Sequence, residues 1–304
     1  MKTIHTTYES IKNNEPITLT IGNFDGLHIG HQNLIEKVKK FSDTKSAVMT
    51  FFPHPMSVIT NKELPILMDI SDKERALKMM HVDIFMVVEF TKAFSKLEKL
   101  EFIEWLKSLQ VKRIVVGRDF KFGHKGSGSV DDLKQHFEVL VVEDLLYKDT
   151  RVSTTYIKLL LEQGDMKLAR KLLNKSYSIH GEVIHGDKVG KMIGYPTANI
   201  DYKNHFLPKI GVYAVIVEIG DKTYLGCANL GHNPTINYST TRRLEVFIMD
   251  YDGNLYEKEI TVSFEYYLRD EIKYDKVEAM LEQIKKDVEQ TYNLLKNKNM
   301  IKYD

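Results

Sequence analysis

Residues 17–31, ITLTIGNFDGLHIGH, combine a strand, a glycine-containing turn and the start of a helix. Aliphatic residues alternate with threonine over residues 17–21, which predicts a strand. Residues 22–26, GNFDG, end that pattern with two glycines, which suit a tight turn or close contact with a ligand. Helical spacing follows over residues 32–40. In this order, free backbone N–H groups and the positive end of a helix face one point, so the segment is typical of a phosphate-binding site.

Two histidines lie at the predicted start of this helix. His28 and His31 are three residues apart, so a first helical turn places both rings on one face. There they could donate hydrogen bonds to phosphate oxygens as negative charge develops on them. A metal-binding pair and two ordinary surface residues are the alternatives, and for a metal site the segment offers no third ligand nearby. We interpret both histidines as candidate catalytic residues.

Length and composition indicate a two-domain globular protein. The chain has 304 residues, enough for two cores, and its net charge of +1 gives no electrostatic reason to expect nucleic acid or an anionic membrane as a partner. The single cysteine, Cys227, excludes an internal disulfide framework. The first residues contain no long apolar run, so we expect neither a signal peptide nor a membrane span, and a cytoplasmic location. The sequence does not predict an oligomeric state.

Strand and helix patterns alternate in the first half of the chain. Further strands are expected at residues 46–52, 83–90, 113–117 and 138–142, with helices at residues 72–80 and 97–109. This alternation predicts an α/β doubly wound parallel sheet of the Rossmann-like kind. Ligands of such sheets bind at the carboxyl ends of strands. The turns at Gly22, Pro53 and Gly117 are expected at those ends.

The second half has a different pattern of predicted secondary structure. Residues 154–173 are helical and charged, and they form a connector that Gly164 and Asp165 break in two. Short β-patterned runs separated by turn residues then predict a small closed antiparallel barrel, at residues 178–183, 212–218, 223–228, 244–249 and 259–264. Residues 277–295 return to helical spacing. We predict two domains, residues 1–172 and 173–304.

Three more motifs in the first half follow expected strands or precede a helix. They are Pro53-His54-Pro55, the glycine-rich segment GRDFKFG at residues 117–123, and the hydroxyl-rich VSTT at residues 152–155. Each alone fits an ordinary turn, loop or helix cap. Together with GNFDGLHIGH, and in this order, they resemble the FMN adenylyltransferases (FAD synthetases) of the nucleotidylyltransferase superfamily.

The resemblance implies that this half binds ATP and FMN. It assigns catalysis to His28 and His31, and binding to Gly22, Asn23, Phe24, Asp25, Gly26, Gly30, His54, Asp119, Phe120, Phe122, Gly123, Ser153, Thr154, Thr155 and Lys158. Thr154 stands where the family usually has serine, and Lys158 where it usually has arginine. Lysine keeps the charge of arginine but loses its bidentate fork.

The second half carries an ordered series of motifs. Residues 186–191, GDKVGK, look like a phosphate-binding Walker A loop, but the next residue is Met192 rather than serine or threonine. The segment GYPTAN at residues 194–199 resembles the signature of riboflavin kinases. Other parts of the same resemblance are GVYA, NLGHNPT, LEV, DGNLY and LRD, at residues 211–214, 229–235, 244–246, 252–256 and 268–270.

This second resemblance implies a riboflavin kinase-like barrel. It assigns Thr197 and Asn199 to Mg²⁺, because hydroxyl and amide oxygens suit that ion, and it makes Glu245 the base for a ribityl hydroxyl. Substrate binding would involve Gly186, Lys191, Gly194, Pro196 and Arg269. Two positions depart from the family pattern: Phe247 stands where histidine is common, and Glu257 where glycine is usual. An added carboxylate would repel ATP if it pointed inward.

Both resemblances together predict a bifunctional enzyme of flavin cofactor synthesis. Riboflavin and ATP would give FMN and ADP, and FMN with a second ATP would give FAD and pyrophosphate, with Mg²⁺ as the metal. The expected partners are therefore the small molecules riboflavin, FMN and ATP. Two alternatives are an FAD synthetase with an inactive barrel and a flavin-binding regulator without catalysis.

Overall fold

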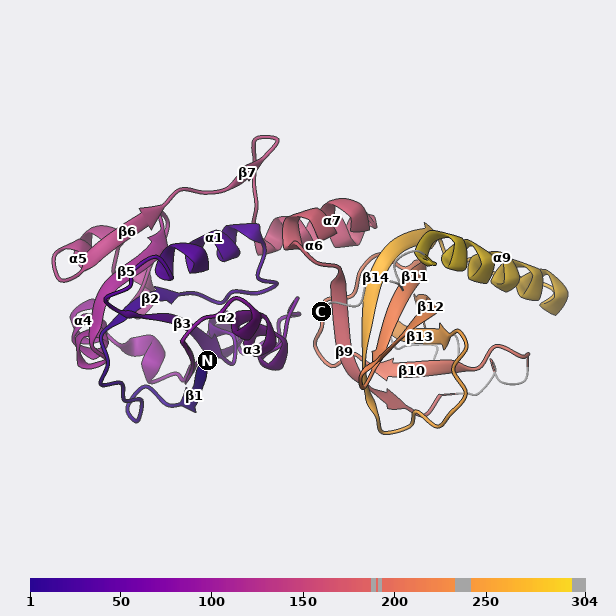
Figure 1. The fold of residues 1–304 in the computed structure, drawn as a ribbon, viewed down its shortest axis with the longest axis horizontal. Coiled ribbons are helices and arrows are strands. Elements are labelled where there is room, and N and C mark those ends of the chain that lie inside the picture. The colour runs from indigo at the N-terminus through magenta and orange to yellow at the C-terminus, as the bar shows by residue number, and fades with distance from the viewer. Residues whose placement is uncertain (187–189, 191–192, 233–241, 297–304) are drawn as a thin grey trace. The chain divides into compact units, whose positions relative to one another are not determined.

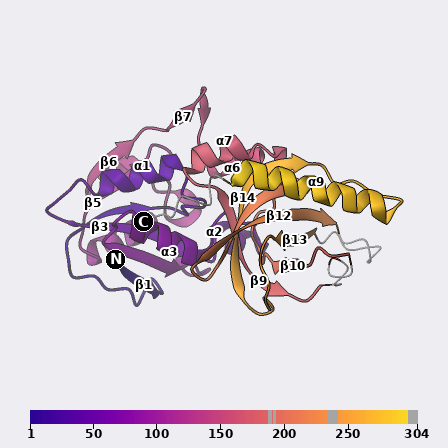
Figure 2. The same ribbon diagram turned by 45° about the vertical axis from the view of Figure 1, so that its right-hand side comes forward.

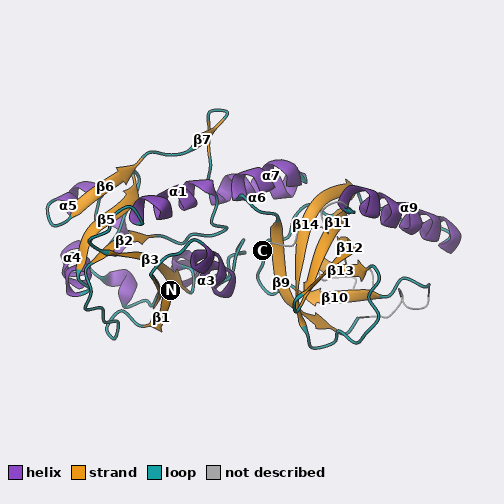
Figure 3. Cartoon of the chain, viewed as in Figure 1, coloured by secondary structure: helices purple, strands orange, loops and turns teal. Residues whose placement is uncertain are grey.

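The computed structural model describes residues 1–186, 190, 193–232 and 242–296. Contacts between residues divide the chain into two compact units, Met1–Thr154 and Thr155–Asp304. Strands and helices alternate in the first unit, whereas strands dominate the second (Figure 1; Figure 3). No described helix combines the length and the apolar composition that a membrane crossing requires.

The first unit is built on a six-stranded sheet in the order β1-β4-β3-β2-β5-β6, and every neighbouring pair is parallel. This confirms the predicted parallel α/β fold. The strands are β1 (Lys2–Thr6), β2 (Ile17–Ile21), β3 (Lys45–Phe52), β4 (Ile84–Glu89), β5 (Val111–Gly117) and β6 (Glu138–Val142). The sequence pattern missed β1, an edge strand with only partly buried side chains.

Helices cover both faces of this sheet, as the nearly continuous apolar strands require. Leu19 and Met49 turn to one face, where they pack with Leu106 of a helix, while Val48 and Phe85 turn to the other face. The helices are α1 (Ile29–Val38), α2 (Pro55–Thr60), α3 (Ile70–Met79), α4 (Lys99–Ser108) and α5 (Val130–Lys134). A small hairpin, β7 (Leu146–Tyr147) and β8 (Thr150–Arg151), follows β6.

The second unit contains a closed barrel in the order β10-β13-β12-β11-β14-β9, which confirms the predicted antiparallel barrel. Its strands are β9 (Tyr177–Ile184), β10 (Thr197–Asp201), β11 (Gly211–Ile219), β12 (Lys222–His232), β13 (Arg242–Ile248) and β14 (Glu259–Arg269). The C-terminal helix α9 (Val277–Leu295) lies along the outer face of the barrel in both views (Figure 1; Figure 2). Arg269 of β14 pairs with the buried Asp287 of α9 at 2.7 Å.

Helices α6 (Thr154–Gln163) and α7 (Met166–Leu173) occupy the predicted connector. The Leu161 carbonyl accepts a hydrogen bond from the Lys209 backbone N–H at 2.9 Å, and Arg170 pairs with the buried Glu265 at 2.9 Å. These contacts group both helices with the barrel. The boundary between residues 172 and 173 stays a prediction about the functional domains.

Candidate active sites

Buried apolar side chains of the turn after β2 fix its conformation. Phe24 and Leu27 are each 2% exposed and pack with Ile35 of α1, although both have positive φ angles, 49° and 46°. Such angles are strained for residues with a Cβ and persist only where packing enforces them. Gly26 between them has a φ of 81°. The predicted turn is therefore a rigid loop at the carboxyl end of β2.

Asp25 holds this loop in place through its own polar groups. Its carboxylate accepts hydrogen bonds from the backbone N–H groups of Leu67 and Met68, at 2.7 and 3.1 Å. Its backbone carbonyl accepts one from the Thr154 hydroxyl at 2.9 Å. Asp25 and Thr154, both predicted as binding residues, thus act as supports of the loop.

His28 and His31 come together as the spacing predicts. Their rings stack with centroids 3.7 Å apart and planes 19° apart. Nδ1 of His28 caps α1 by accepting the backbone N–H of His31 at 3.3 Å. A Cβ at Gly30 would lie 3.2 Å from the His28 ring, so the glycine leaves room for this cap. Nδ1 of His31 is buried and has no partner among the described residues.

Both imidazoles are held neutral. Burial, followed by the charge of Arg151, lowers the pKa of His28 to about 4. Burial also lowers the pKa of His31 well below its usual value, with smaller contributions from His28, Lys73 and Arg151. Because Nδ1 of His28 accepts a hydrogen bond, its proton resides on Nε2. The pair can therefore offer N–H donors near neutral pH without carrying charge.

Arg151 lies outside the motifs that indicate the site from sequence. It follows the β7–β8 turn and pairs with Asp119 of the glycine-rich segment at 2.7 Å and with Asp144 at 3.0 Å. After burial, its charge contributes to the lowered pKa values of both His28 and His31. In the sequence, only its position directly before the VSTT motif indicates that it could belong to the site.

The remaining predicted residues of the first half have varied surroundings. The side chain of Asn23 lies 2.9 Å from Nε2 of His54, which caps α2. Phe122 is 5% exposed and packs on Phe102, so it belongs to the core. Gly22 directly follows β2, the Phe120 ring stacks on Phe122, and Gly123 adopts a positive φ. In the hydroxyl-rich motif, Ser153 is half-buried and Thr155 is exposed. The Lys158 ammonium lies 5.5 Å from the centre of the Phe206 ring.

In the second unit, three polar side chains form a row across neighbouring strands. Asn199 of β10 is the direct cross-strand partner of Glu245 of β13, and Glu245 is in turn the partner of Asn229 of β12. Their neighbours Ala198 and Val246 are buried inside the barrel, so the row faces outward. The Arg243 guanidinium lies 3.8 Å from the Glu245 carboxylate.

A glycine-lined cradle lies against this row. A Cβ at Gly186 would lie 2.1 Å from the Asn199 amide nitrogen, and one at Gly190 would lie 3.2 Å from the Thr197 hydroxyl. Thr197 and Asn199 share one face of β10, because residues two apart in a strand do so. The predicted Thr197, Asn199 and Glu245 are therefore brought together. Gly194 and Pro196 are exposed, and Lys191 lies outside the described residues.

Two family models match the chain, one on each part. Residues 10–156 match FAD synthetase and residues 173–295 match riboflavin kinase. Two bifunctional riboflavin kinase/FMN adenylyltransferases are similar over nearly their whole length. The Listeria monocytogenes protein is 37% identical over 90% of both chains, and the Bacillus subtilis protein is 34% identical over 98% of this chain and 99% of its own. The chain belongs to the bifunctional riboflavin kinase/FMN adenylyltransferase family.

A solved structure has the same fold throughout. A Streptococcus pneumoniae protein described as a macrolide-efflux protein is 31% identical, with a TM-score of 0.87 over 96% of this chain and 99% of its own. The family prediction made from the motifs is confirmed, including the prediction that both transferase activities are combined in one chain.

The departures from the family pattern have local physical reasons. Phe247 packs in the apolar cluster beneath α9, with the Tyr195 ring 5.2 Å away, so an aromatic ring suits this position. Glu257 has a φ of 65°, in the left-handed region that favours glycine, and its side chain is exposed. The usual glycine thus meets a backbone requirement, and glutamate adopts the same conformation.

Proposed function

We propose that the barrel transfers the γ-phosphate of ATP to riboflavin and that the α/β unit then transfers AMP from a second ATP to FMN. The observation that carries the proposal is the presence of a separate polar site in each unit. His28 and His31 form the site of the first unit, and Asn199, Glu245 and Asn229 form that of the second. Each site lies within residues that one of the two family models matches.

In the first unit, an oxygen of the FMN phosphate attacks the α-phosphorus of ATP and pyrophosphate leaves. Neither His28 nor His31 needs to form a covalent bond. As neutral donors they stabilise the negative charge that develops on the phosphate oxygens. The positive charge of Arg151 increases this stabilisation. The loop that Asp25 anchors keeps these groups in position before substrate binds.

In the second unit, Glu245 orients the ribityl hydroxyl and accepts its proton during phosphoryl transfer. Thr197 and Asn199 would hold Mg²⁺ through their side-chain oxygens, because hard oxygen donors suit this ion. Glycine at position 186 avoids a Cβ that would collide with the Asn199 amide. The bound ion supplies charge neutralisation on the phosphates of ATP. Arg269, which the motifs assign to substrate binding, is held on β14 by its pair with Asp287.

The proposed reactions also define the expected partners and location of the protein. Riboflavin, FMN and ATP are its expected partners, and we expect it to act in the cytoplasm without nucleic acid or membrane. The near-neutral net charge of +1 is in keeping with small-molecule substrates.

Product analysis separates this function from its alternatives. The pure full-length chain is incubated with riboflavin, ATP and Mg²⁺, and the flavins are resolved by chromatography. Appearance of FMN followed by FAD supports the bifunctional reading. FAD formed only from supplied FMN indicates an inactive barrel, and no product indicates a flavin-binding regulator.

A further inference from the structure

Helix α3 carries a lysine on its buried face. Lys73 is three residues after Ile70 and four before Leu77, so it shares the helix face that packs on Phe24 and Leu27. Its side chain is only 7% exposed. An ammonium group is costly to bury unless a partner compensates its charge. The position of Lys73 therefore calls for an anion.

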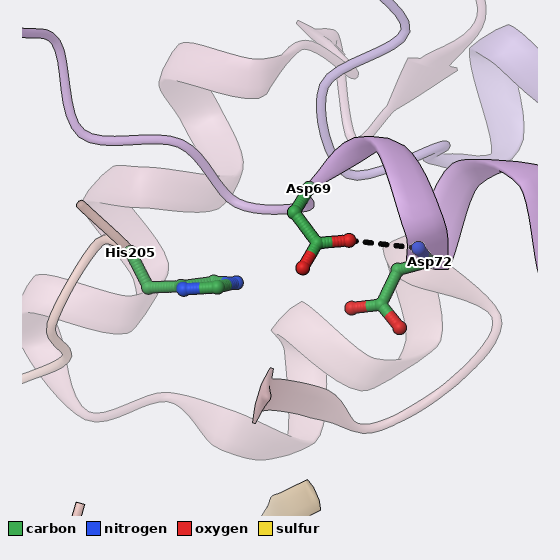
Figure 4. A group of neighbouring side chains, drawn as sticks. All are labelled: Asp69, Asp72 and His205. Carbon is green, nitrogen blue, oxygen red and sulfur yellow. Dashed lines mark hydrogen bonds between the residues drawn. The ribbon is translucent and has the colours of Figure 1, made fainter. Parts of the chain in front are cut away.

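Asp25 and Asp69 contribute negative charge near Lys73, but both carboxylates accept hydrogen bonds from backbone N–H groups. Asp25 accepts two backbone N–H groups, at 2.7 and 3.1 Å, and Asp69 caps α3 by accepting the Asp72 backbone N–H at 2.7 Å (Figure 4). Burial lowers the pKa of Lys73, and the charges of Asp25 and Asp69 only oppose this effect. In the part of the chain that the structure describes, no ion pair or hydrogen bond involves the Lys73 ammonium.

The charge of Lys73 also reaches the histidine site. It contributes to the lowered pKa of His31, after burial and His28. Asp25, which acts on Lys73, belongs to the loop that presents His28. The α3 face that carries Lys73 packs on Phe24, and the Phe24 ring contacts His31 with centroids 5.2 Å apart. On the proposed function, this buried cation therefore lies near the place where the phosphates of ATP and FMN meet.

We propose that Lys73 is a phosphate-binding residue of the adenylyl-transfer site. Its ammonium pairs directly with phosphate oxygens of a nucleotide substrate, which add to the more distant negative charges of Asp25 and Asp69. Two sources share this chemistry: the β- and γ-phosphates of ATP, which leave together as pyrophosphate, and the phosphate of FMN. The proposal rests on the proposed function, and it adds a substrate contact to the site.

The test compares Lys73→Met, which keeps the long apolar stem, with Lys73→Arg, which keeps the charge. Lys78→Met, on the exposed side of the same helix, is the matched control. With the full-length chain, FAD formation from FMN and ATP is followed, and so is the reverse reaction from FAD and pyrophosphate. Lys73→Met should raise KM for pyrophosphate or for FMN by ~10- to 100-fold, as expected for a charge-assisted hydrogen bond. Whichever KM rises identifies the phosphate that is bound.

The Arg variant, the control and the melting temperatures distinguish phosphate binding from a structural role of Lys73. Lys73→Arg should recover a large part of the lost affinity, while Lys78→Met should leave both KM values unchanged. Without ligands, Lys73→Met should melt at the same temperature as the wild type or higher, because no charge remains to be desolvated. A lower melting temperature with unchanged KM values would show a purely structural lysine and overturn the proposal. A wild type that makes no FAD from FMN would contradict the proposed function instead.

Discussion

The His28 and His31 rings stack 3.7 Å apart, and Nδ1 of His28 accepts the backbone N–H of His31. Two protonated rings at this distance would repel each other, and protonation of Nδ1 would break the helix cap. The arrangement therefore depends on neutral imidazoles, which their lowered pKa values provide.

Stability should fall in weakly acidic solution because of His28. Its pKa is about 4 in the folded protein against an ordinary 6.5, so the unfolded chain takes up a proton first as the pH drops. The contribution of His28 is fully present above pH 6.5 and is lost as the pH falls to 4. The shift corresponds to about 3 kcal/mol. Urea unfolding at several pH values should show a smaller loss for His28→Asn, which keeps a cap acceptor, than for the wild type. Equal losses would place the titration elsewhere.

The hydroxyl of Thr154 should matter for FAD synthesis alone. Thr154→Val removes the hydrogen bond to the Asp25 carbonyl and loosens the loop that carries the histidines. Loss of one such bond corresponds to roughly a tenfold lower rate of FAD formation. Thr154→Ser, which keeps the donor, is the control and should behave as the wild type. If the valine variant forms FAD at the wild-type rate, the hydrogen bond to the Asp25 carbonyl does not matter for the site.

Glu257 should be replaceable by glycine without loss of kinase activity. Its φ of 65° costs ~1–2 kcal/mol for a residue with a Cβ, and the gain on relieving it is partly offset by the greater freedom of glycine in the unfolded chain. We expect Glu257→Gly to melt at the same temperature or higher, while Lys258→Gly, at a residue without a positive φ, melts lower. A large increase in FMN formation by Glu257→Gly would instead show that the carboxylate inhibits the barrel.

Glu245 should be needed for turnover more than for binding. Glu245→Gln keeps the shape and can accept a hydrogen bond, but it cannot take the proton of the ribityl hydroxyl. We expect kcat for FMN formation to fall by ~10²–10⁴-fold with little change in riboflavin binding. FAD formation from supplied FMN should persist. Near-normal kinase turnover in this variant would remove Glu245 from the mechanism.

Strands with strong apolar patterns could be predicted from the sequence. The run DIFMVVEF at residues 83–90 contains β4, and the expected turn lies within residues 22–28, which connect β2 to α1. Strand β1 could not be found in this way, because its pairing with β4 at the sheet edge depends on tertiary contacts rather than on its own pattern.

The charged residues near the sites could not be predicted from the sequence alone. Lys73 resembles any lysine of an amphipathic helix, and only the packing of α3 shows that it is buried. Arg151 and Asp287 acquire their significance from partners distant in sequence, Asp119 and Arg269. The motifs predicted Asn199 and Glu245 separately, whereas the register of β10 and β13 places them opposite each other.

The separation of the two activities is the central claim, and His31→Ala tests it most directly. The variant is incubated with riboflavin, ATP and Mg²⁺, and FMN and FAD are quantified over time. Loss of one transition-state donor predicts a ~10²–10³-fold slower formation of FAD, while FMN forms at the wild-type rate and accumulates. If FMN formation falls in parallel with FAD formation while the variant remains folded, the two reactions do not have separate sites and the account is contradicted.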